Sequence, residues 1–176
     1  MAVAYRPVQW NRNKLVYDAI LAAGITIYVL LFLRFAPGWL DVKPVGGAEL
    51  RMRAFGSCAY IMLHLILIIG PLARLDRRFL PLLYNRRHFG VALFFVALAH
   101  ALHVVGWYQA FSPIDPYAAL LAGNTNVTSF IGFPFEYLGI AALLILFVMA
   151  ATSHDFWLNF LGAPFWKAIH MAVYAA

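Results

Sequence analysis

The stretch RRHFGVALFFVALAHALHVVGWY, residues 86–108, decides the fold class of this chain. After its two arginines it contains no Asp, Glu, Lys or Arg, but it includes His88, His100 and His103. A transmembrane helix needs about 20 mostly apolar residues, and this run is long enough. An imidazole inside such a helix is costly to bury and usually faces the interior of a bundle. The stretch therefore predicts a membrane helix that carries candidate functional histidines.

The rest of the chain follows the same pattern. Its 176 residues are 64% hydrophobic and 11% charged, which is typical of an integral membrane protein. We expect an all-α, polytopic transmembrane helical bundle with four full spans, at roughly 15–36, 54–73, 89–110 and 135–153. A fifth apolar run follows Lys167 and covers about half of a span. We therefore expect a fifth span cut short at the C-terminus, and a single domain over 1–176 that is incomplete there.

The distribution of basic residues predicts an orientation. One side of the predicted bundle would hold Arg6, Arg12, Lys14, Arg74, Arg77, Arg78, Arg86, Arg87 and Lys167, and the other Arg34, Lys43, Arg51 and Arg53. The positive-inside rule then favours a cytoplasmic N-terminus, in a bacterial inner membrane. Arginines at membrane edges need no nucleic-acid partner. The aromatic segment 156–166 is expected to lie along the inner surface, where aromatic rings are favoured.

The spacing of the histidines leaves two kinds of site open. At about 1.5 Å per residue, His100 lies about 18 Å deeper than His88, whereas His170 lies at a depth similar to that of His88. Ligands at two depths suit two stacked hemes. Alternatively, His100 and His103 are close enough in sequence for a compact metal site that His64 would complete.

Each residue also has a simpler interpretation. His100 and His170 could hydrogen-bond to another helix, although the cost of burial favours a ligand. His88 could be an interfacial side chain that extends toward water. The remaining histidines are interpreted as packed or supporting residues (His64 and His103) or as solvated (His154). Arg86 and Arg87 are topology determinants that can also pair with heme propionates.

Four segments carry a resemblance to a known family. They are IIGPLARL (68–75), RRHFGVALFFVALAH (86–100), FPFEYLGIAALLILFVMAATS (133–153) and LGAPFWKAIHMAVYAA (161–176). In this order and spacing they resemble the ferric reductase-like transmembrane family. The nearest resemblance within it is to the heme-binding membrane subunit of the bacterial methionine sulfoxide reductase system.

The resemblance covers roughly 50–176 and implies a bundle that binds one or two b-type hemes. It implies that His100 and His170 are axial ligands, with Trp166 four residues before His170, and places Arg86 near the inner heme. The family's second histidine in the fifth helix would lie beyond the sequence. His88 is a candidate inner ligand, and His64 or His103 a candidate replacement for the missing one.

We accordingly expect an electron-transfer subunit of an oxidoreductase. Electrons would enter from quinol or flavin, with quinone or FMN at the inner side, and leave outward. The sequence has no G-x-G-x-x-G fingerprint, so donor and acceptor would be separate molecules or subunits. The rival hypotheses are a proton or metal-ion transporter that uses the same histidines, and a structural anchor subunit of a larger membrane complex.

Overall fold

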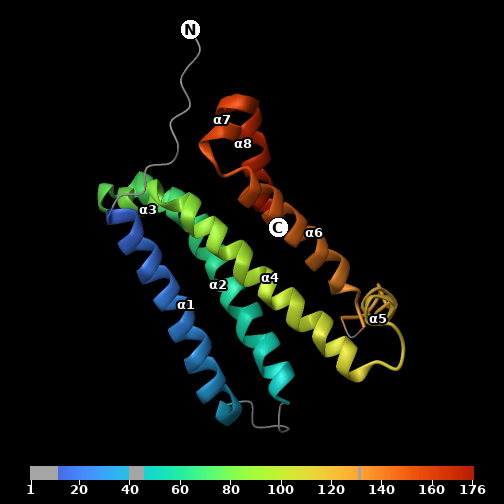
Figure 1. The fold of residues 1–176 in the computed structure, drawn as a ribbon. Coiled ribbons are helices and arrows are strands. Elements are labelled where there is room, and N and C mark those ends of the chain that lie inside the picture. The colour runs from blue at the N-terminus through green and yellow to red at the C-terminus, as the bar shows by residue number, and fades with distance from the viewer. Residues whose placement is uncertain (1–11, 40–45, 131) are drawn as a thin grey trace.

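The computed structural model describes residues 12–39, 46–130 and 132–176 and is all-helical there, as expected (Figure 1). The helices are α1 (Arg12–Trp39), α2 (Gly47–Leu75), α3 (Leu80–Tyr84), α4 (Arg86–Phe111), α5 (Pro116–Ala122), α6 (Phe135–Ala151), α7 (Asp155–Leu161) and α8 (Ala163–Met171). Two 3₁₀ turns, η1 (Arg77–Phe79) and η2 (Ala172–Ala175), complete the described secondary structure.

Three of the described helices, α1, α2 and α4, are long and apolar enough to cross a membrane. They contain 28, 29 and 26 residues and include the predicted spans 15–36, 54–73 and 89–110. They extend past these spans because the helices continue into the polar residues at the membrane edge. In α2, for example, Arg53 forms an ion pair with Glu49, one helical turn earlier, at 2.5 Å.

The predicted fourth span is a shorter helix. With 17 residues, α6 is at the lower limit for crossing a bilayer. The next helix, α7, is bent by 93° from it, so this pair counts as a fourth span only as one bent unit. The break has a local cause: the hydroxyl groups of Thr152 and Ser153 donate to carbonyls of the last turn, and His154 then caps α7.

The segment 156–166 forms two helices instead of one surface segment. Gly162 separates them with φ of 77°, a conformation that glycine adopts without strain. α7 lies across the axis of α6, as a helix along the surface would, whereas α8 turns back beside α6 (Figure 1). Val173, just after α8, is 3% exposed.

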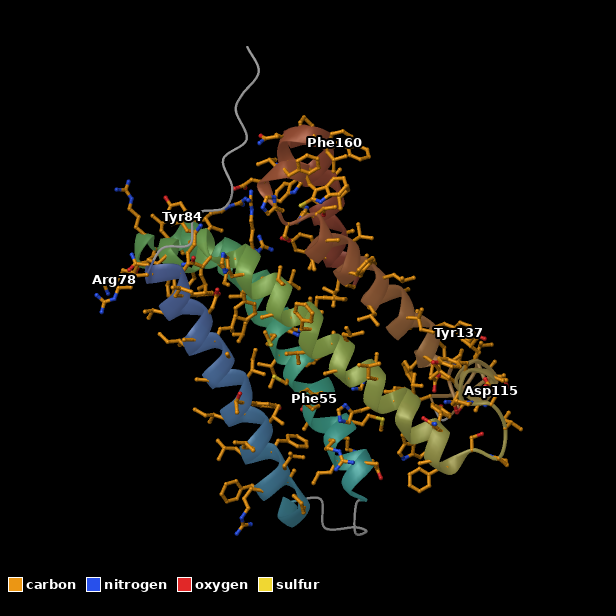
Figure 2. All side chains as sticks on the ribbon, in the orientation of Figure 1. Phe55, Arg78, Tyr84, Asp115, Tyr137 and Phe160 are labelled. Carbon is orange, nitrogen blue, oxygen red and sulfur yellow. The ribbon has the colours of Figure 1, made fainter. Side chains whose placement is uncertain are left out.

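Helices α2 and α4 pack along each other at the centre of the bundle, with α1 beside α2 and α6 beside α4 (Figure 1). The shared core is small and apolar: Cys58, Met62, Ile66, Leu93, Val96 and Leu146. Many large apolar side chains point outward instead (Figure 2), for example Ile20 at 68% exposure and Leu102 at 64%. Such outward apolar faces suit a protein whose helices are surrounded by lipid tails.

The two ends of the bundle differ in charge. One end, here called the basic end, collects the start of α1, the end of α2, α3, the start of α4 and the α7–α8 turn (Figure 1). Figure 2 shows Arg78 and Tyr84 there, and Asp115 and Tyr137 at the opposite end. Described basic residues of the basic end are Arg12, Lys14, Arg74, Arg77, Arg78, Arg86, Arg87 and Lys167, against Arg34, Arg51 and Arg53 at the opposite end.

Candidate functional site in the helix bundle

His170 is fixed near the basic end by a tryptophan. Its Nδ1 lies 3.0 Å from the carbonyl oxygen of Trp166, and the two rings stack with centroids 3.8 Å apart. The indole N–H of Trp166 donates to the carbonyl of Thr152 at 2.8 Å, which ties α8 to the end of α6. Because the carbonyl only accepts, Nδ1 carries the proton and Nε2 carries the lone pair.

The other nitrogen of His170 is left without a partner. Nε2 is buried and makes no hydrogen bond within the described part of the chain, although the backbone of Met149 approaches the ring. A buried polar atom normally has a partner, so an orphaned one needs an explanation. A ring oriented through Nδ1–H to a carbonyl, with Nε2 turned inward, is the arrangement of a metal-binding histidine.

Three consecutive residues at the start of α4 point in three directions, since each step turns the helix by about 100°. The guanidinium of Arg86 lies 3.9 Å from where a Cβ on Gly70 of α2 would stand. Arg87 forms an ion pair with Asp155 of α7, and its guanidinium carbon lies 5.0 Å from the ring centroid of Trp166. Arg87 therefore lies on the α7–α8 side, close to His170.

His88 points toward α1 instead. Its Nδ1 lies 2.9 and 3.0 Å from the two carboxylate oxygens of Asp18, seventy residues away in sequence. The pair borders a cleft of about 680 Å³ between α1, α4 and the α6–α7 turn. His88 begins α4 and His170 lies near Arg87, so both are at the basic end, but their contacts lie on different sides of α4.

His100 lies deeper and faces α2. Its Nδ1 is 2.9 Å from the carbonyl oxygen of Met52. The ring fits because residue 56 is glycine: a Cβ there would stand 2.9 Å from both Nδ1 and Cε1 of His100. Since thirteen residues separate Arg87 from His100, the imidazole lies about 20 Å along α4 from the His170 region. The structure does not bring His100 and His170 together.

The other histidines bond locally. His64 is exposed on α2 and bonds to the Tyr60 carbonyl at 2.8 Å. His103 bonds to the Ala99 carbonyl at 2.7 Å and stacks on Phe55, with ring centroids 5.1 Å apart. Among the described residues, no group of three or more His, Cys, Asp or Glu side chains is placed to hold a metal ion. The compact metal site of His64, His100 and His103 is therefore not formed.

Comparison with known proteins assigns the family. The model of the ferric reductase like transmembrane component matches residues 55–176, which include α4 and α8 with His100 and His170.

The chain belongs to the ferric reductase-like transmembrane family.

Several members similar to this chain have the same name, protein-methionine-sulfoxide reductase heme-binding subunit MsrQ. The one from Bordetella pertussis is 31% identical over 157 residues, covering 89% of this chain and 68% of the relative. The one from Rhodospirillum rubrum is 31% identical over 166 residues, covering 94% and 73%. The one from Brucella ovis is 30% identical over 171 residues, covering 97% and 68%. No solved structure matches the chain. As a member of this family with several apolar helical spans, the chain is an integral membrane protein.

Three features of this ferric reductase-like chain were missed from sequence. Asp18 could have been suspected, because an acidic residue in an otherwise apolar helix is rare without a role. Gly56 carries only the weak signal of a small residue in a span, which often marks close helix packing. Glu136 accepts from Tyr108 at 2.9 Å and Asn124 at 2.5 Å, and its pairing across the loop before α6 has no sequence signal.

Proposed function

We propose that this chain is a membrane subunit that binds b-type heme and passes electrons across the bilayer. Family membership and the names of the relatives, which are heme-binding subunits, support heme binding. The observation that carries the proposal is the buried Nε2 of His170, which has no hydrogen-bond partner among the described residues while its ring is held by Trp166. An iron–porphyrin would give this atom the partner that it lacks.

His170 and His100 are the proposed axial ligands. Their separation along the bundle favours two hemes at two depths over one heme shared by both. The niche at Gly56 fits a histidine ligand as well, because Nδ1 of His100 is fixed by a carbonyl, which leaves Nε2 as the lone-pair atom. We leave His88 out of this ligand pair, since its ring is engaged with Asp18 on the α1 side.

Arginines at the basic end are the proposed partners of heme propionates. Arg87 lies beside the Trp166–His170 stack, and Arg86 faces α2. Guanidinium groups bind carboxylates through paired hydrogen bonds. A heme held by these residues would supply one-electron redox chemistry. The residues of this chain hold and orient the group and exclude water from it.

Helix α1 precedes the matched region, and we propose that it belongs to the same domain over 1–176. The Tyr28 hydroxyl donates to Ser57 of α2 at 3.0 Å, and Leu21 and Ile25 pack on the shared core.

We further propose that the basic end faces the cytoplasm of a bacterium, following the positive-inside rule. Electrons from a quinol or flavin would enter there, and an acceptor or partner subunit would take them at the opposite end.

Heme quantification per chain tests the proposal. The wild-type protein should show an intense Soret band that sharpens on reduction. His170→Ala and His100→Ala should each lose at least half of the bound heme. His64→Ala is the matched control: it is a histidine of a span, but its side chain is exposed and bonds to its own helix, so heme content should not change.

The rival functions predict different results. A proton or metal-ion transporter predicts a colourless wild-type protein. A structural anchor predicts that neither His100→Ala nor His170→Ala alters colour. Loss of heme in His64→Ala to the same extent as in the other two would contradict the ligand assignment.

A further inference from the structure

An apolar groove lies between α1 and α2 and has a volume of about 360 Å³. Four of its lining residues share one face of α1 at helical spacing: Tyr17, Leu21, Gly24 and Tyr28. On α2, Ile61 and Leu65 line the groove and are 42% and 50% exposed. The groove is therefore open on one side to the surrounding lipid, and neither proposed heme ligand lines it.

Gly24 keeps the middle of this groove wide. A small residue in a membrane helix commonly lets a neighbouring helix approach closely. Here, no heavy atom of a described neighbour lies within 4 Å of the position that a Cβ on Gly24 would take. The two helices are nevertheless joined one turn away, where the Tyr28 hydroxyl donates to Ser57 at 3.0 Å. The glycine thus leaves apolar surface that gains dispersion energy when an apolar chain packs against it.

The length of the groove matches one leaflet of a bilayer. Tyr17 and Tyr28 lie about 16 Å apart along α1, at a rise of about 1.5 Å per residue. The hydrocarbon core of a bilayer is about 30 Å thick, so one leaflet contributes about 15 Å. The groove is therefore as long as one lipid acyl chain that runs from the basic end toward the bilayer midplane.

The end of the groove at Tyr17 is basic. Leu82 of α3 also lines it, and Arg77 and Arg78 precede Leu82 in the connection between α2 and α4. Both arginines are exposed, and Figure 2 shows Arg78 at the outer edge of that end of the bundle. Asp76 is the only acidic residue of this connection, and its carboxylate lies 3.9 Å from Nε of Arg78. The connection therefore keeps a positive charge beside the groove.

We propose that the groove binds one acyl chain of an anionic phospholipid, whose phosphate group is held by Arg77 and Arg78. This site goes beyond the proposed function, because it needs no heme. Guanidinium groups bind phosphate through paired hydrogen bonds, and basic residues beside membrane helices recognise anionic headgroups. A zwitterionic phospholipid offers the same acyl chain, but its headgroup also carries a cationic group that the arginines repel.

Native mass spectrometry of the purified full chain tests this site, with dipalmitoyl phosphatidylglycerol and dipalmitoyl phosphatidylcholine as the two probes. The dissociation constant of the first bound lipid should be lower for phosphatidylglycerol by about tenfold or more, the effect expected of two arginines beside a headgroup. Gly24→Trp fills the groove and should remove this tight binding. Ala23→Trp is the matched control, because Ala23 is exposed but does not line the groove, and it should bind as the wild type does.

A second pair of variants tests the headgroup contact without altering the groove. Replacing Arg77 and Arg78 together by glutamine should weaken phosphatidylglycerol binding by about tenfold or more and leave phosphatidylcholine binding unchanged. Replacing Arg34 and Arg51 together by glutamine removes the same charge from exposed residues at the opposite end, and should change neither affinity.

Four results would overturn the site. They are equal affinity of the wild type for the two lipids, equal phosphatidylglycerol affinity of Gly24→Trp and Ala23→Trp, an equal loss in the two arginine pairs, and displacement of bound phosphatidylglycerol by equimolar decylubiquinone. The last result would assign the groove to a quinone tail. None of these measurements depends on heme, so a colourless wild-type protein defeats the proposed function and leaves the lipid site standing.

Discussion

Adding one methyl group at Gly56 should disturb His100 directly. A Cβ at this position would stand 2.9 Å from Nδ1 and Cε1 of the imidazole, where ordinary contact begins near 3.4 Å. The ring in Gly56→Ala must therefore move by about half an ångström, which also strains the bond from Nδ1 to the Met52 carbonyl. Overpacking of this kind destabilises by about 1–3 kcal/mol.

The alanine also has an opposing effect, because replacing glycine within a helix stabilises it by about 1 kcal/mol. Gly139→Ala in α6 is the control that isolates the clash, since nothing lies within 4 Å of its Cβ position. The helix-propensity gain is common to both variants. The difference between them in unfolding free energy should therefore be about 1–3 kcal/mol, in favour of Gly139→Ala.

Two measurements decide this prediction. Denaturing-detergent titrations give the unfolding free energies, and the Soret band gives heme occupancy. Gly56→Ala should lose stability relative to Gly139→Ala and also lose heme, because the ring no longer presents its nitrogen in the same place. If both variants have the same stability and the same spectrum, the niche that Gly56 is argued to provide for His100 does not exist.

Three further predictions concern the contacts around the two ends. Trp166→Phe removes the indole hydrogen bond to Thr152, so it should lower the unfolding free energy by about 1 kcal/mol and shift the heme reduction potential; an unchanged potential would contradict the positioning role. Arg87→Gln breaks the pair with Asp155, but the side chain is 38% exposed, so the loss in a titration should stay below about 1 kcal/mol. Glu136→Gln replaces a shared acceptor and should loosen the loop before α6, seen as faster proteolysis there than in the wild type.

The sequence predicts the spans well because hydropathy and length are local properties. The histidine depths also follow from the chain alone, since the helical rise places His100 well inside α4 and His88 at its start. The predicted fourth span ends at residue 153, whereas α6 ends at Ala151. The helix ends two residues earlier because the hydroxyl groups of Thr152 and Ser153 donate to carbonyls of its last turn.

The neighbours of each histidine could not be predicted in the same way. The pairing of His88 with Asp18 depends on how α1 packs against α4, and these residues are seventy positions apart. Likewise, the niche for His100 depends on the register between α2 and α4, which small residues permit but do not specify. Helix-to-helix register is a property of the whole bundle. The local sequence pattern therefore indicates which residues face the interior, but not which residues of the other helices they contact.

The most direct test of the account is an experimental structure of the heme-loaded protein. It should show a porphyrin at the basic end, with Nε2 of His170 bonded to the iron and its Nδ1 still bonded to the Trp166 carbonyl. A structure with heme bound elsewhere, and Nε2 of His170 bonded only to protein or water, would contradict the central claim.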